Sequence, residues 1–154
     1  MKREIGLIVL LMTTTVACIH KQSGTVSPWE RVNVNMAALA QINNDVAKGL
    51  IAAQQAGVLT AQQAAPILGY QETVAKDHAA IENILAAGSA KAADQATQIQ
   101  GLLNEIKNQG TALIQAGNLG IKNPRSQQLF SQDLQGIINL AQVILTDYQL
   151  AEGN

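Results

Sequence analysis

The sequence predicts an all-α fold, an up-down-up-down antiparallel four-helix bundle. Along four segments, apolar residues recur at three- and four-residue steps, which places them on one face of each of four helices. No stretch alternates apolar and polar residues for long enough to form a strand. We expect helices of nearly equal length, roughly 27–29 residues or about 42 Å each, joined by short connections, which favours antiparallel neighbours.

The first helix has clear start and stop signals. Ser27 offers an N-cap, Pro28 suits the first helical position, and Glu30 completes a capping box. Gly57 follows the helix, where a left-handed residue can close the last turn. The apolar stripe between these signals consists of Val32, Met36, Leu39, Ile42, Val46, Leu50 and Ala53.

The second helix begins at another capping box, made by Thr60 and Gln63, with Leu59 placed to act as a hydrophobic staple. Pro66 lies inside this helix, where it removes a backbone donor, so we expect a kink or a separate short turn from Thr60 to Ala65. The stripe consists of Ile67, Tyr70, Val74, His78, Ile81 and Leu85.

The third and fourth helices are delimited by Gly88, Ser89, Gly117 and the pair Asn123-Pro124. If Gly88-Ser89 stays helical, the second and third helices merge into one rod. The third stripe consists of Ala92, Ala96, Ile99, Leu103, Ile106, Gly110 and Leu113. The fourth consists of Phe130, Leu134, Ile137, Ala141, Ile144 and Tyr148.

A weak internal repeat agrees with four helices. A shift of 60 residues aligns Asn44-Asp45-Val46 with Asn104-Glu105-Ile106, and Gln55-Ala56-Gly57 with Gln115-Ala116-Gly117. The bundle could therefore be a duplicated helical hairpin. Helices rich in alanine and glutamine also match one another by composition alone, so both explanations stay open.

An export signal is predicted at the start of the chain. Lys2 and Arg3 precede an unbroken apolar block from Ile5 to Met12, and the polar tract of Thr13, Thr14 and Thr15 follows. A membrane-spanning helix needs about 20 apolar residues, whereas the core of a signal peptide needs about 7–15. The block is therefore the length of a signal core.

Cys18 is the only cysteine in the chain, and Thr15-Val16-Ala17 precedes it. This order resembles the lipobox of bacterial lipoprotein signal peptides. The resemblance implies cleavage between Ala17 and Cys18 and attachment of a lipid to Cys18. Ordinary cleavage after Ala17 would instead leave a secreted protein with a free thiol, which is a liability in an oxidising compartment. An uncleaved anchor is the third alternative.

The resemblance also implies a location and a domain plan. Ile19 after the cysteine is not the aspartate that retains lipoproteins in the inner membrane, which favours the outer membrane, facing the periplasm. We expect a signal peptide at 1–17, a lipidated cysteine with a flexible tether at 18–26, and the helical bundle at 27–154. The tether can reach at most roughly 3.3–3.6 Å per residue.

Composition argues against several functions. Without Lys2, Arg3 and Glu4, eight basic and ten acidic residues remain of the 10 and 11 in the chain, a formal charge near −2. That balance and an aromatic content of 3% argue against nucleic-acid binding and against electrostatic attachment to an anionic membrane. Hydrophilicity comes instead from 18 glutamines and 11 asparagines.

His78 is the one candidate metal ligand or catalytic residue, because it falls on the second apolar stripe with Asp77 and Glu82 nearby. A metal site in a bundle core would need several inward carboxylates and histidines, typically as Glu-x-x-His motifs, and the sequence has none. We therefore interpret His78 as a hydrogen-bonded residue at the edge of the core, and we expect no cofactor.

Trp29 and Tyr148 should lie at the same end of an antiparallel bundle, next to the tether. They could contact lipid headgroups, or they could fill the open end of the bundle. For function we expect a non-enzymatic envelope lipoprotein that binds another envelope protein through helix faces. The alternative is a carrier of a small molecule or metal in the bundle interior, which would need a cavity with convergent polar groups.

Overall fold

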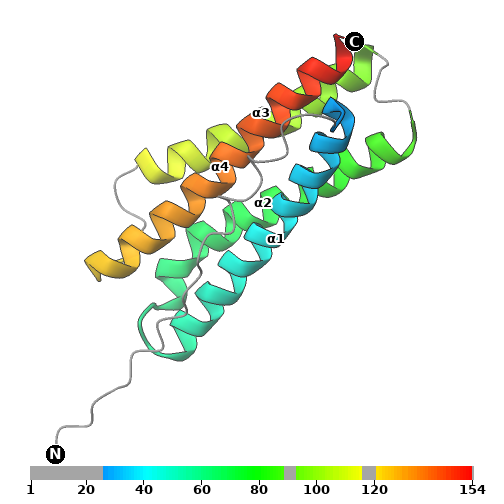
Figure 1. Cartoon of the computed structure of the whole chain (residues 1–154). Helices are drawn as coiled ribbons and strands as arrows, with labels where there is room; N and C mark the ends of the chain where they lie inside the picture. The colour runs from blue at the N-terminus through cyan, green and yellow to red at the C-terminus, as the bar shows by residue number, and fades with distance from the viewer. Residues whose placement is uncertain (1–25, 89–92, 116–120, 154) are drawn as a thin grey trace, which may run out of the picture.

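The computed structural model describes residues 26–88, 93–115 and 121–153, and these residues form the predicted antiparallel four-helix bundle (Figure 1). The helices are α1 (Pro28–Gln55), α2 (Ala61–Ala86), α3 (Ala93–Gln115) and α4 (Pro124–Glu152). Each helix packs against two others: α1 against α2 and α4, and α3 against α2 and α4. No strand forms among the described residues. Consecutive helices run in opposite directions, so the start of α1 and the end of α4 lie at the same end.

The predicted starts of α1, α2 and α4 are confirmed. Ser27 Oγ accepts a hydrogen bond from the Glu30 backbone N–H, and Glu30 Oε2 accepts one from the Ser27 N–H at 2.7 Å. The backbone and hydroxyl of Ser27 together hold the pKa of Glu30 below its usual value. Thr60 and Gln63 form the same reciprocal pair at α2, and Asn123 Oδ1 accepts from two N–H groups at α4. These contacts satisfy donors that have no partner inside the helices.

Gly88 ends α2 and separates it from α3. Its φ is +66° and α2 ends at Ala86, so the two helices do not merge into one rod. Gly57 closes α1 in the same left-handed conformation, with φ of +70°. Ser89 and Gly117 lie outside the described residues. The described part of α3 spans 23 residues, Ala93–Gln115, against the 27–29 expected, and the residues on either side of it lie outside the description.

Of the two outcomes expected at Pro66, a kink or a separate turn from Thr60 to Ala65, the separate turn is wrong, because α2 continues through this residue. Pro66 is the sixth residue of the helix, and the only donor it removes is the one that would reach the Gln62 carbonyl. Both residues are exposed, so water can satisfy that carbonyl. The capping box at Thr60 holds the start of the helix in place.

The four apolar stripes meet in one core. The largest fully buried side chains all belong to the predicted stripes: Leu39, Leu50, Ile67, Ile81, Ile99, Leu103, Ile106, Leu134, Ile137, Ile144 and Tyr148. Ile42, Ala53, Leu85 and Leu113 are half-buried at its edge, and Ala92 lies outside the described residues. Stripe positions that point inward from all four helices are what give the bundle its stability.

Gly110 is the glycine that the packing requires. Tyr70 Oη donates a hydrogen bond to the Ile106 carbonyl at 3.0 Å, which brings the ring of Tyr70 against α3. A Cβ on Gly110 would lie 2.6 Å from Tyr70 Oη and 2.8 Å from Ile138 Cγ1. Burial also raises the pKa of the Tyr70 phenol, so it remains a donor at neutral pH. Tyr70 therefore occupies the space that a side chain at position 110 would need.

We predict opposite effects for two glycine substitutions on α3. Gly110→Ala should lower the free energy of unfolding by about 1–3 kcal/mol, because the new methyl group overpacks the Tyr70 contact. Gly101→Ala is the matched control, since its Cβ would meet nothing within 4 Å. It should raise stability by up to about 1 kcal/mol through helix propensity. Urea titrations followed by circular dichroism would measure both, and equal stabilities for the two variants would contradict the close packing at Gly110.

Candidate interaction surface

The predicted lipidation site cannot be placed, because Ala17 and Cys18 lie outside the described residues. His78 can be placed, and it is buried. Its Nε2 lies 2.8 Å from the Met36 carbonyl oxygen of α1, and its Nδ1 lies 3.6 Å from Glu82 Oε2 one turn further along α2. A carbonyl oxygen only accepts, so Nε2 carries the proton and donates it. His78 thus joins α2 to α1 at the edge of the core.

A second polar contact joins the same two helices. Asn43 Nδ2 donates to the Gln71 carbonyl and Gln71 Nε2 donates to the Asn43 carbonyl, each at 3.2 Å. Both side chains are buried, so this reciprocal pair fixes the position of α2 along α1. Within the described part of the chain, no group of three or more His, Cys, Asp or Glu side chains is arranged to hold a metal ion. Nor is any helix there long and apolar enough to span a bilayer.

Asp77 is a buried carboxylate on α2. Its Oδ2 has no hydrogen-bond partner among the described residues. Burial raises the pKa of Asp77, and the charge of Glu105 on α3 raises it further. Ionisation of this carboxyl group costs more in the folded chain than in the unfolded chain, so an ionised Asp77 destabilises the fold. That penalty shrinks as the pH falls from the raised folded-state pKa towards the ordinary pKa of an aspartate.

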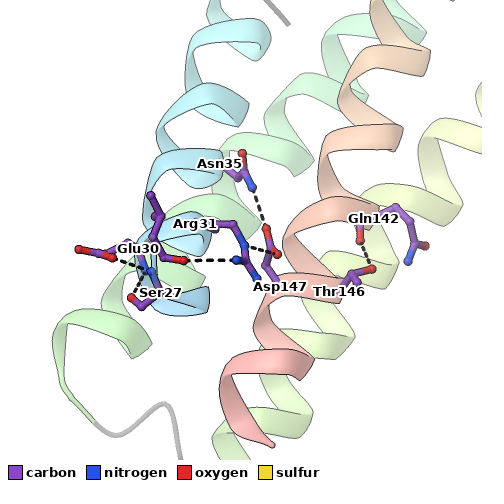
Figure 2. A network of polar contacts seen from close by, with 8 residues as sticks. Ser27, Glu30, Arg31, Asn35, Gln142, Thr146 and Asp147 are labelled. Atoms are coloured by element: carbon purple, nitrogen blue, oxygen red, sulfur yellow. Dashed lines mark hydrogen bonds and ion pairs between the residues drawn. The ribbon is translucent and has the colours of Figure 1, made fainter. Parts of the chain in front are cut away.

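The contact between α1 and α4 centres on Asp147 (Figure 2). Its Oδ1 accepts a hydrogen bond from Arg31 Nε at 2.8 Å, and its Oδ2 accepts one from Asn35 Nδ2 at 3.0 Å. The side chain of Asp147 is 11% exposed and that of Arg31 is 40% exposed. Arg31 Nη1 also donates to the Val26 carbonyl at 3.3 Å. The Asp147 carboxylate therefore binds two residues of α1, Arg31 and Asn35. Arg31 in turn binds the backbone just before α1.

Next to this contact, Trp29 and Tyr148 meet at the same end of the bundle, as predicted. Their ring centroids are 5.6 Å apart and the rings are nearly perpendicular, at 85°. Tyr148 is fully buried, and its hydroxyl donates to Glu152 Oε1 at 3.1 Å. Burial and the neighbouring Glu152 carboxylate raise the pKa of the phenol. The pair fills the junction of α1 and α4.

The outer face of α4 differs from the rest of the surface. Between Arg125 and Glu152, every exposed residue of α4 is uncharged, and its one half-buried carboxylate there, Asp133, has a pKa raised by burial. The other three helices each expose charged side chains: Glu30 and Lys48 on α1, Glu72, Lys76 and Glu82 on α2, and Asp94 and Glu105 on α3. Protein surfaces normally carry such charges throughout, whereas the centres of interfaces are depleted of them.

The residues of this outer face repeat every seven positions, in three parallel lines. The apolar line is Leu129, Gly136, Val143 and Leu150. The central line is Gln132, Asn139 and Thr146. The glutamine line is Gln128, Gln135, Gln142 and Gln149. We call these three lines together the α4 face.

Contacts with the neighbouring helices orient the α4 face. Asp147 bonds to α1 and lies one turn from both Val143 and Leu150, so the apolar line runs along the α1 side. Gln142 Oε1 accepts from Lys107 Nζ of α3 at 2.9 Å, so the glutamine line runs along the α3 side. Leu129, Val143 and Leu150 are 54%, 42% and 51% exposed. A sustained seven-residue repeat is the pattern by which one helix packs along another.

This face was not predicted from the sequence, although its signal is present there. The buried stripe of α4 gives a stronger signal because every member is apolar. The α4 face mixes four apolar or small residues with neutral amides, and only the exact seven-residue spacing distinguishes it. The contacts of Asp147 gave no signal at all, because Arg31 is 116 residues away in the chain.

No protein-family model matches the chain, and no curated protein or solved structure matches it either.

The role of Asp147 can be tested by truncation. Asp147→Ala should lower the free energy of unfolding by about 1–3 kcal/mol, because Arg31 and the buried Asn35 lose their acceptor. Asp45→Ala is the control, since it removes an exposed i, i+3 pair with Lys48 and should change stability by less than about 0.5 kcal/mol. Thermal unfolding followed by circular dichroism would measure both. Similar values for the two variants would mean that Asp147 does not hold α1 against α4.

Proposed function

We propose that this protein is a non-enzymatic lipoprotein of the cell envelope that acts by binding another protein through the α4 face. The observation that carries the proposal is the exposed surface of α4 from Gln128 to Leu150, which is uncharged and repeats every seven residues. Such a surface has a cost in solubility, because exposed apolar side chains gathered in one line promote association. A binding partner that covers the apolar line would explain why these side chains are kept at the surface.

The chemistry of the face indicates how it binds. Glutamine and asparagine side chains both donate and accept hydrogen bonds, so the central and glutamine lines can pair with a polar rim of a partner without any charge. Leu129, Val143 and Leu150 supply the apolar contact. Because no ion pair is involved, the binding should depend little on ionic strength.

The anchor in this proposal rests on the resemblance of residues 1–18 to a lipoprotein signal. The bundle begins at Ser27, so the tether from Cys18 enters at the junction of α1 and α4. We place the protein on the outer membrane, facing the periplasm. The carrier alternative would rest on buried oxygens without a partner among the described residues, Asn43 Oδ1, Gln71 Oε1 and Asp77 Oδ2. The side-chain donors of Asn43 and Gln71 bond to the chain itself.

Acylation gives a direct test of the anchor. Metabolic labelling with an alkynyl fatty acid should tag the wild-type protein, and Cys18→Ser should lose the label, because the thiol is the attachment point. Ser23→Ala, in the predicted tether, is the control and should be labelled as the wild type is. Equal labelling of wild type and Cys18→Ser would end the lipoprotein interpretation.

Site-specific photocrosslinking in cells tests the surface. A photoreactive amino acid at Asn139 or Gln135 on the α4 face should give discrete crosslinked adducts. The same amino acid at the exposed residues Asn44 on α1, Glu72 on α2 and Asn108 on α3 should not. Adducts of equal yield from all four helices, or from the control positions alone, would mean that the α4 face is not the contact surface.

A further inference from the structure

Along the α4 face, the order of residue types is nearly the same in both directions of the helix. On either side of Asn139, residues whose distances from it along the chain are equal or differ by one form compatible pairs within each line. Gln128 corresponds to Gln149, and Gln135 corresponds to Gln142. Leu129 corresponds to Leu150, and Gln132 corresponds to Thr146. The remaining pair, Gly136 with Val143, joins a residue without a side chain to a branched one.

This near-palindrome is what a two-fold symmetric contact between identical helices requires. In an antiparallel pair, the two-fold axis is perpendicular to the plane of the two helices and maps each line onto the same line of the partner. The apolar line then meets the apolar line, and the glutamine line meets the glutamine line. In a parallel pair, the axis exchanges the two outer lines, so that the apolar line faces glutamines. Only the antiparallel pair matches like with like.

Each matched pair also fits chemically. Leu129 of one copy meets Leu150 of the other at both ends of the contact, and glutamine amides can bond reciprocally because each donates and accepts. The contact needs no charge of opposite sign, which agrees with a face that carries none.

Gly136 gives an independent reason to expect an antiparallel contact between two α4 helices. A glycine inside a helix is less stable than an alanine, and a Cβ at this position would meet nothing within 4 Å. Its own bundle therefore does not require glycine, as it does at Gly110. Gly69 and Gly101 share this open space, but they lie on other helices. In the antiparallel pair, the side chain of Val143 from one copy lies over Gly136 of the other, and the gap is filled.

We propose that the occupant of the α4 face is a second copy of this chain, with the two α4 helices antiparallel and a two-fold axis near Asn139. This inference rests on the proposed function, because it names the partner of the same surface. The seven-residue lines suit helices that cross at about 20°. They run from Gln128 to Leu150, a contact roughly 33 Å long.

Cysteine crosslinking distinguishes the possible arrangements. Full-length chains carrying Cys18→Ser, so that each introduced cysteine is the only thiol, would be purified in detergent and treated with a short bis-maleimide. Asn139→Cys should crosslink to itself, because this position lies at the axis. Gln128→Cys alone should not, because its two copies are roughly 33 Å apart. A mixture of Gln128→Cys and Gln149→Cys should crosslink.

Sedimentation velocity of the same full-length chains measures the strength of association. Val143→Lys should weaken dimerisation about tenfold or more, since it buries a charge against Gly136. Ile51→Lys is the matched control, because Ile51 is 50% exposed but belongs to α1, and it should leave dimerisation unchanged. In the antiparallel pair, position 135 of one copy faces position 142 of the other. The double variant with Gln135→Glu and Gln142→Glu should therefore not dimerise, because like charges face each other. The double variant with Gln135→Lys and Gln142→Glu should dimerise, because opposite charges face each other.

The outcomes distinguish a failure of the antiparallel dimer from a failure of the proposed function. A monomer in sedimentation, with no crosslink at Asn139→Cys, would overturn the antiparallel pair. Self-crosslinking of Gln128→Cys would also overturn it, since it indicates a parallel pair. If the chain is monomeric while photocrosslinking in cells at Asn139 gives an adduct that is not twice the chain mass, a different protein occupies the face and the proposed function stands.

Discussion

Asp147 accepts hydrogen bonds from Arg31 and Asn35 at once, and the arrangement of the bundle at this end depends on that carboxylate. The α1–α4 contact closes the ring of helices, since α1 and α4 are the first and last of the four. Because Asp147 is held against α1, Val143 and Leu150, one turn away on either side, are left on the outer edge of the seam. The same interaction that closes the core therefore turns the apolar line outward.

Polar contacts fix the positions of the helices along one another, whereas apolar contacts fix only which faces meet. His78 with Met36 and the reciprocal pair of Asn43 and Gln71 fix α2 against α1. Tyr70 fixes α3 against α2 through the Ile106 carbonyl. A sliding movement of one turn would keep most apolar contacts but would leave these buried groups without partners, which is costly.

The sequence was sufficient for the fold because its signals are local. Capping at Ser27, Thr60 and Asn123, and the four apolar stripes, involve residues no more than one or two turns apart. It was insufficient at Pro66, where the lost backbone donor left a separate turn open as one outcome, whereas the capped, packed helix continues through that residue. It was also insufficient for the candidate surface. Whether Leu129 or Val143 lies in the core or outside depends on where the neighbouring helix sits, and that is decided by distant pairs such as Arg31 with Asp147.

The double role of Arg31 has a mechanical consequence. Its guanidinium binds Asp147 of α4 and also the Val26 carbonyl, at the point where the chain enters α1. If the protein is held by a lipid at Cys18, any force on the anchor arrives at this point. Arg31 passes part of that load to α4, and the Trp29–Tyr148 contact supports the same junction. A pull on the anchor thus acts on α1 and α4 together and not on the first turn of α1 alone.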